Sequence, residues 1–166
     1  SLKRYFKDPV GASKNLVKTD LIALSRGELV IHYERLLSPK ISLEIQYGRV
    51  FAYNSATLDN FLAKESSPKN TQGYSYGIQF RHYISSLAPE RYYTSLLYRY
   101  RKLDIHAQAQ MDITGGIGIQ SRITNYFLWD VALMSGTRLH SNNSEEKPQG
   151  KGVPLMYLQA KIVYLF

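Results

Sequence analysis

Cysteine is absent from this sequence of 166 residues, so the chain can form no disulfide, thiolate-bound zinc site or cysteine nucleophile. Long apolar runs are missing as well, since no segment approaches the roughly 18 apolar residues that a transmembrane helix needs. No signal peptide is visible, because Ser1 begins a polar and basic segment. If the protein is exported, we expect a signal to have been removed before Ser1.

Acidic residues are outnumbered, with 13 Asp and Glu against 21 Lys and Arg and a net charge of +8. The basic residues form no cluster on a helix and no aromatic-rich RNA-binding motif, so we expect no nucleic-acid partner. Anionic lipid headgroups fit the same charge better. His32, His82 and His106 fall on different expected strands without paired metal spacing, so we expect no metal and no cofactor.

The stretch from Val153 to Phe166 alternates strictly between two kinds of side chain. A β-strand sends successive side chains to opposite faces. One face would carry Phe166, Tyr164, Ile162, Ala160, Leu158 and Met156, and the other Leu165, Val163, Lys161, Gln159, Tyr157 and Leu155. An exposed strand edge beside an apolar face would promote aggregation of a water-soluble domain. Closing the sheet into a barrel within a lipid bilayer removes the edge and places the apolar face in hydrocarbon.

Seven further segments alternate in the same way, which predicts an all-β fold, an eight-stranded antiparallel up-and-down transmembrane β-barrel. The expected strands are Asn15 to about Leu24, Glu28 to Leu37, Ile41 to Tyr53, Gly73 to Ser85, Arg91 to about Asp104, about Gln108 to Ile123, the residues after Asn125 as far as His140, and Val153 to Phe166. Residues 1–14 are basic, contain Pro9 and Gly11, and are interpreted as a periplasmic N-terminal tail, leaving residues 15–166 as the barrel.

The connections differ in length in a regular way. Those around Pro39, Pro89 and Asn125 are short, whereas the breaks at 54–72 and 141–152 are long and alternate with them around the barrel. The first long break has Leu58, Phe61 and Leu62 at helical spacing, which suggests a helical turn or two. Short periplasmic turns and longer outer loops are typical of outer-membrane barrels. With eight strands and the short turns in the periplasm, both termini are expected in the periplasm as well.

Tyrosine is abundant, at 14 residues against six Phe and one Trp, and is typical of the aromatic girdles at membrane interfaces. A soluble lipocalin-like barrel that binds a ligand is the alternative fold, since it also alternates but keeps its apolar face inward. The expected polar face carries Gly, Ser, Gln and charges of both signs, which suits a packed interior better than a solubilising surface.

The alternating last strand, with Phe166 at its end and Tyr164 and Ile162 before it, resembles the signal by which outer-membrane barrels are recognised for assembly. The whole chain resembles the small eight-stranded barrels typified by the OmpA membrane domain and OmpX. The segments LVKTDLIAL, LVIHYERLLSPKISLEIQYG and GIQFRHYI are similar to an uncharacterised barrel family common in Bacteroidetes. The resemblance covers about Asn15 to Phe166 and implies a bacterial outer-membrane location in the Gram-negative envelope, with the barrel-assembly machinery as a partner of the last strand.

Charged residues on the expected inward faces are the main candidate site. An eight-stranded barrel is only wide enough for side chains to fill it, so buried charges there must pair. We therefore predict a lumen charge network of Glu34, Glu44, Arg81, Arg99, Arg101, Asp112, Arg122, Asp130, Arg138 and Lys161, with Lys18 and Asp20 also facing inward. Glu34 or Glu44 is expected to pair with an inward Arg on a neighbouring strand. A gated ion path or proton relay is the functional alternative, disfavoured by the narrow lumen.

Two other motifs are candidates for a binding or catalytic site. Gly116 and Gly118 lie mid-strand, so they are interpreted as space for large inward side chains such as Tyr83 or Arg99 rather than as a phosphate loop. His140 and Ser141 invite comparison with outer-membrane lipid A deacylases. However, adjacent strand residues point to opposite faces and no acidic partner can be assigned, so we assign no catalytic residue.

These observations predict a non-enzymatic integral outer-membrane barrel with a side-chain-filled lumen, acting as a structural or accessory subunit of an envelope complex. Outer-membrane lipids are the expected surroundings, and a larger outer-membrane protein complex is a candidate partner, since a protein contact would explain how Arg49 interrupts an apolar face. The alternatives are a lipid-modifying enzyme of the lipid A deacylase kind and the soluble lipocalin-like barrel.

Overall fold

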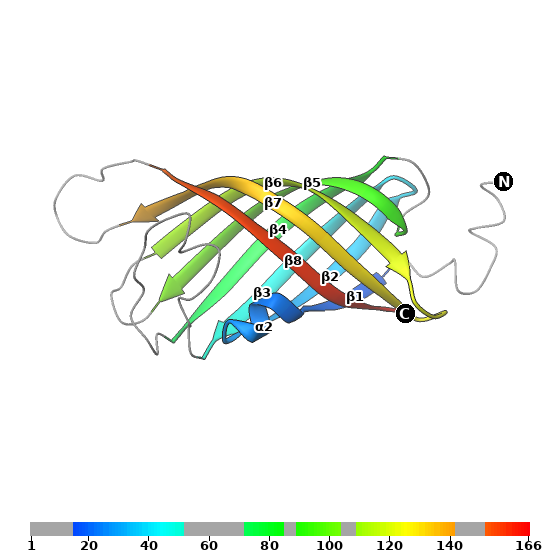
Figure 1. The fold of residues 1–166 in the computed structure, drawn as a ribbon, viewed down its shortest axis with the longest axis horizontal. Helices are drawn as coiled ribbons and strands as arrows, with labels where there is room; N and C mark the ends of the chain where they lie inside the picture. Colours follow the sequence, from blue (N-terminus) through cyan, green and yellow to red (C-terminus); the bar gives the residue numbers. More distant parts are fainter. Residues whose placement is uncertain (1–14, 52–71, 85–88, 104–108, 142–151) are drawn as a thin grey trace.

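The computed structural model describes residues 15–51, 72–84, 89–103, 109–141 and 152–166. These residues form a closed barrel of eight antiparallel strands in which sequence neighbours are also neighbours in the sheet (Figure 1). The all-β, up-and-down fold predicted from the sequence is therefore confirmed. The strands are β1 (Asn15–Asp20), β2 (Glu28–Ser38), β3 (Ile41–Val50), β4 (Gly73–Tyr83), β5 (Arg91–Leu103), β6 (Ala109–Arg122), β7 (Phe127–Ser141) and β8 (Val153–Leu165).

Several expectations fall outside the described residues: the N-terminal tail at 1–14, the helical turns within 52–71, His106 and the loop at 142–151. In the described part of the chain, the single helix is α2 (Leu21–Ser25), between β1 and β2. No helix among the described residues is long and apolar enough to cross a membrane.

Side chains alternate between the inside and the outside of the barrel along every strand. In β8, Met156, Leu158, Ile162, Tyr164 and Phe166 are between 42% and 56% exposed. The alternate residues, Leu155, Tyr157, Gln159, Lys161, Val163 and Leu165, are all buried. The two faces predicted for this strand are therefore the outer and inner faces of the barrel.

The first strand ends four residues earlier than the sequence predicted. The carboxylate of Asp20 accepts hydrogen bonds from the backbone N–H groups of Ile22 (2.9 Å) and Ala23 (3.0 Å), which caps the short helix α2. This side-chain cap offers the backbone an alternative to the strand ladder. The prediction of a strand through Leu24 was wrong. Leu21 and Ala23 continue the alternation of β1, so the sequence pattern does not show that the helix cap at Asp20 ends the strand.

The early end of β1 leaves a short seam in the barrel wall. β1 pairs with β8 only from Leu16 to Asp20, opposite Leu165 to Lys161. Among the described residues, the stretch Val153–Ala160 of β8 has no strand partner on its β1 side. Helix α2 packs against both β8 and β2 there, as Figure 1 shows.

The connections divide the barrel into two ends. At one end of the barrel, called the turn end, β2, β4 and β6 end and β3, β5 and β7 begin; Asn15 and Phe166 lie there too, and the backbone N–H of Phe166 donates to Asn15 O at 3.2 Å. The opposite end, called the loop end, contains α2, the last residues of β3, β5 and β7 and the first residues of β4, β6 and β8. The two longest gaps between strands, after β3 and after β7, both begin and end at the loop end, as the sequence predicted.

Replacing Asp20 with Ala is expected to lower the free energy of unfolding by about 1 kcal/mol, because the cap of α2 is lost. Asp20→Asn is expected to retain most of the stability, since Asn caps helices about as well as Asp. Equilibrium unfolding in urea, followed by circular dichroism, measures both variants. Equal stability of Asp20→Ala and the parent protein would contradict the role assigned to the cap.

Candidate functional site

The ten charged residues assigned to the lumen lie on seven strands, and nine of them have buried side chains. Arg122 differs: its side chain is 28% exposed and pairs with Glu90 at 2.6 Å, close to the turn end. Lys18 and Asp20 are buried as well. The barrel interior is therefore strongly ionic, and its cations and carboxylates need partners within it.

Six of these residues form a central ionic cluster from strands far apart in the sequence: Lys18, Glu34, Glu44, Arg81, Asp130 and Lys161. The guanidinium of Arg81 reaches Asp130 at 2.7 Å and Glu44 at 2.8 Å. The Glu44 contact joins neighbouring strands β3 and β4, as expected from the sequence. Three cations face three carboxylates, so the cluster balances its formal charge.

The ammonium groups complete the cluster. Lys18 Nζ contacts Glu34 and lies 3.0 Å from carboxylate oxygens of both Glu44 and Asp130. Lys161 Nζ lies 2.8 Å from Glu44 Oε1. Lys18 comes from β1 and Lys161 from β8, so the cluster spans the seam where the barrel closes.

Neutral side chains form further hydrogen bonds with the carboxylates of the cluster. The hydroxyl groups of Tyr93 and Tyr83 donate to Asp130 (2.5 Å) and Glu34 (2.9 Å), and Ser42 also donates to Glu34. His32 Nδ1 lies 2.8 Å from Glu44 Oε1. The guanidinium of Arg81 also lies 4.4 Å from the centroid of the Tyr93 ring, a cation–π distance.

A second ionic group lies nearer the loop end. Asp112 accepts from Arg99 (2.7 Å) and from Arg138 (2.8 Å), and the Arg99 guanidinium lies 5.3 Å from the centroid of the Tyr157 ring. Glu28 pairs with Arg101 at 2.7 Å and accepts from Ser75 at 2.6 Å. Ion pairs therefore continue along the lumen from the central cluster towards the loop end.

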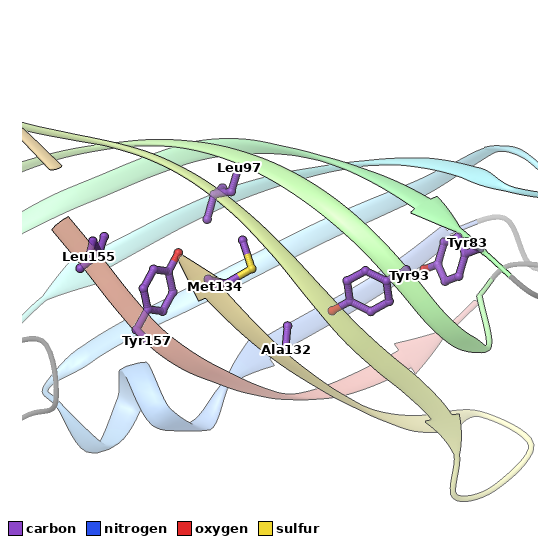
Figure 2. Packing of buried hydrophobic residues seen from close by; sticks show 7 residues of the cluster. All are labelled: Tyr83, Tyr93, Leu97, Ala132, Met134, Leu155 and Tyr157. Carbon is purple, nitrogen blue, oxygen red and sulfur yellow. The ribbon is translucent and has the colours of Figure 1, made fainter. Parts of the chain in front are cut away.

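Apolar side chains fill the spaces beside and below the ion pairs. Figure 2 shows one cluster, made of Tyr83, Tyr93, Leu97, Ala132, Met134, Leu155 and Tyr157. A second cluster closes the turn end, where Leu36 packs against the buried side chains of Leu16, Leu128, Val163 and Leu165. The described part of the lumen is thus packed with ionic side chains and with apolar ones beside them.

The inward glycines make room for side chains other than those expected. A Cβ on Gly118 would meet the ring of Tyr93, and a Cβ on Gly116 would meet the side chain of Met134. The prediction named Tyr83 or Arg99, and it was wrong because cross-strand register decides which side chain lies over each glycine. Tyr93 pairs with Gly118 and Met134 with Gly116.

Sequence reasoning missed Tyr93 and treated His32 only as a metal ligand. Strand alternation indicates that both residues face inward, since Tyr93 follows the outward Tyr92 and His32 lies between the outward Ile31 and Tyr33. Within the described residues, no group of three or more His, Asp or Glu side chains is arranged to hold a metal ion. The structure carries β7 through His140 and Ser141, but their side chains lie outside the described part.

No protein-family model matches the chain, and a search of the curated proteins finds no match either. The function is therefore inferred from the geometry of the barrel.

Replacing Arg81 with Met is expected to lower the free energy of unfolding by about 3–5 kcal/mol, because it leaves Glu44 and Asp130 with too few cations in a buried site. Arg122→Met is the control, since its ion pair with Glu90 is partly exposed and contributes at most about 1 kcal/mol. Urea unfolding measures both. If Arg81→Met does not fold, Arg81→Lys tests the same point with the charge retained. A loss no larger than that of Arg122→Met would contradict the importance of the cluster.

Gly118→Ala is expected to destabilise the barrel by about 1–3 kcal/mol, because the added methyl group overlaps the Tyr93 ring. Gly115→Ala is the matched control, since an added Cβ there has its nearest contact at 3.8 Å, from Ser95 O. Thermal unfolding of the two variants compares them directly. Similar midpoints would show that Tyr93 has room to move.

Proposed function

We propose that this protein is an integral β-barrel of the bacterial outer membrane, with a closed lumen and a structural or accessory role in the envelope. The observation that carries the proposal is the arrangement of polarity: ion pairs fill the inside, and large apolar side chains cover the outside. A barrel in water requires the opposite on at least its outer face. Hydrocarbon is the solvent that suits this surface.

The apolar outer surface involves every strand. Each strand has at least one outward aliphatic side chain that is 37% exposed or more: Val17, Ile31, Ile45, Ile78, Leu96, Ile117, Leu133 and Leu158. Burying apolar surface is worth about 25 cal/mol per Å². A belt of this extent is too large to leave in water on a monomeric soluble protein.

Aromatic side chains flank the belt at both ends. At the loop end, Tyr47, Tyr76 and Tyr100 lie opposite one another on β3, β4 and β5. At the turn end, Tyr164 lies 5.4 Å from Phe127 and 6.4 Å from Phe166, measured between ring centroids. Two aromatic bands around an aliphatic middle match the two interfaces of a bilayer.

The packed lumen supports a role other than conduction. Buried ion pairs and two apolar clusters fill the described interior, and an eight-stranded barrel leaves little further space. A soluble lipocalin-like barrel would need an apolar cavity in the same place. No observation favours the lipid-modifying alternative.

The orientation follows from the two ends. The turn end, with its short turns, would face the periplasm, and the loop end would face outward. In the outer face of β8, Ile162, Tyr164 and Phe166 are 42%, 45% and 56% exposed. They are thus available to the barrel-assembly machinery, which we include as a proposed partner.

Trp129, the only tryptophan, tests the membrane location because its side chain faces outward and is 38% exposed. In vesicles of brominated phosphatidylcholine, its fluorescence is expected to be quenched most by bromines near the glycerol backbone, since Trp129 lies close to the turn end. Moving the reporter to Leu133, about 13 Å further along β7, is expected to favour deeper bromines.

The variant for this comparison is Trp129→Phe combined with Leu133→Trp. The control quencher is acrylamide, which reaches side chains in water. Strong quenching by acrylamide together with none by brominated lipid, at both positions, would place the belt in water and exclude the proposed location.

A further inference from the structure

Three outward residues form a row across the loop end of the barrel. Arg49 on β3 pairs in register with Tyr74 on β4, and Tyr74 pairs with Lys102 on β5. Neighbouring strands lie about 4.8 Å apart, so the backbones of Arg49 and Lys102 are about 10 Å apart with Tyr74 between them. Two flexible cations can therefore approach one anion above a tyrosine ring.

A pocket of about 150 Å³ lies beside this row where β3 ends and β4 begins, lined by the outward Tyr47, Arg49 and Tyr74 and by Val50, Gln72 and Gly73; Lys102 is outside its lining. One water molecule occupies about 30 Å³ in the liquid, so the pocket has room for a group such as a phosphate. Its lining supplies a guanidinium, an amide and tyrosine side chains, all of which can donate hydrogen bonds to phosphate oxygens.

The two cations of the row differ from those inside the barrel. Arg81 and Arg99 each have a carboxylate within 2.7 Å, whereas neither Arg49 nor Lys102 forms an ion pair with any described residue. The guanidinium of Arg49 lies 5.9 Å from the centroid of the Phe51 ring, which leaves its N–H groups available. An anion from outside the chain can therefore bind here without displacing a carboxylate of the described residues.

Below the cations, the outer surface changes character in two steps. One row nearer the middle, Tyr76 lies between Tyr47 and Tyr100, and its ring is stacked on that of Tyr100 at 4.9 Å. The next row has Ile78 opposite Ile45 and Tyr98. Each step is two residues, or about 7 Å along a strand. A row with two cations, a row of three tyrosines and a row with two isoleucines beside Tyr98 thus follow one another, in the order of a lipid's headgroup, glycerol region and acyl chain.

We propose that Arg49, Tyr74 and Lys102 bind the phosphate of an anionic membrane lipid, whose acyl chain lies over Tyr76 and Ile78. The binding site rests on the proposed membrane location and names a ligand for the outer surface. It also explains the charge in the apolar belt at Arg49 by a lipid headgroup, where the sequence alone suggested a protein contact. Basic residues and aromatic rings close to the interface are suited to such headgroups.

The test uses a reporter beside the acyl-chain row, made by Tyr98→Trp with Trp129→Phe. The protein is placed in vesicles that mix phosphatidylglycerol and phosphatidylcholine, with bromines on the acyl chains of one lipid at a time. The ratio of the two quenching curves gives the preference for the anionic lipid next to the reporter. We expect the anionic lipid to be preferred, and Arg49→Ala and Lys102→Ala each to lower that preference about fivefold.

Arg35→Ala is the matched control, since Arg35 is an outward, exposed arginine on β2 towards the turn end. It is expected to leave the preference unchanged. A preference that persists when Arg49 and Lys102 are both replaced, or a parent protein quenched equally by both lipids, would overturn the headgroup site and favour a protein contact at Arg49. Loss of the preference on adding inorganic phosphate at constant ionic strength would assign the site to a soluble anion and likewise overturn it. Absence of quenching by either lipid would instead overturn the membrane location.

Discussion

Neutralisation of buried charge is the constraint on which this barrel depends. An ionised group taken out of water without a partner costs several kcal/mol, so each lumen cation needs a carboxylate nearby. The central ionic cluster provides this with groups from six strands, and Lys18 and Lys161 come from the first and the last strand. Contacts between strands that are not neighbours, such as that of Arg81 on β4 with Asp130 on β7, form only when the sheet has closed. The same ion pairs that closure makes possible therefore favour the closed barrel over any open sheet.

The outer surface follows from the same arrangement. With the polar residues of each strand committed to the interior, alternation leaves the apolar ones outside, on all eight strands. That surface is graded along the barrel axis, from aromatic rings at each end to aliphatic chains between them, with cations above the rings on β3 and β5. The inner and outer faces are thus two consequences of one sequence pattern, although the forces acting on them differ.

Alternation was sufficient to predict eight strands and their faces, because side chains alternate with a period of two whichever register the strands adopt. Nine of the ten charges assigned to the inside have buried side chains. Alternation could not predict contacts across the lumen. Whether Arg81 on β4 meets Asp130 on β7 depends on the stagger of strands that are not neighbours, and that stagger is a property of the closed barrel. Which ring lies over Gly118 depends on the register between the neighbouring strands β5 and β6, and alternation does not fix that register. The end of β1 escaped prediction for a local reason: Asp20 fits the inward pattern of a strand and is also a good helix cap.

The short seam between β1 and β8 bears on how the chain reaches its final shape. Every other neighbouring pair is close in sequence and can form as a hairpin, whereas Leu16 and Leu165 are separated by almost the whole chain. Bringing such distant segments together is the slowest kind of contact to form. With five residue pairs, this pairing is as short as that of β1 with β2, and the two are the shortest in the barrel. Closure of the ring therefore joins the segments most distant in the sequence through one of the shortest strand pairings, so we expect it to form late in folding.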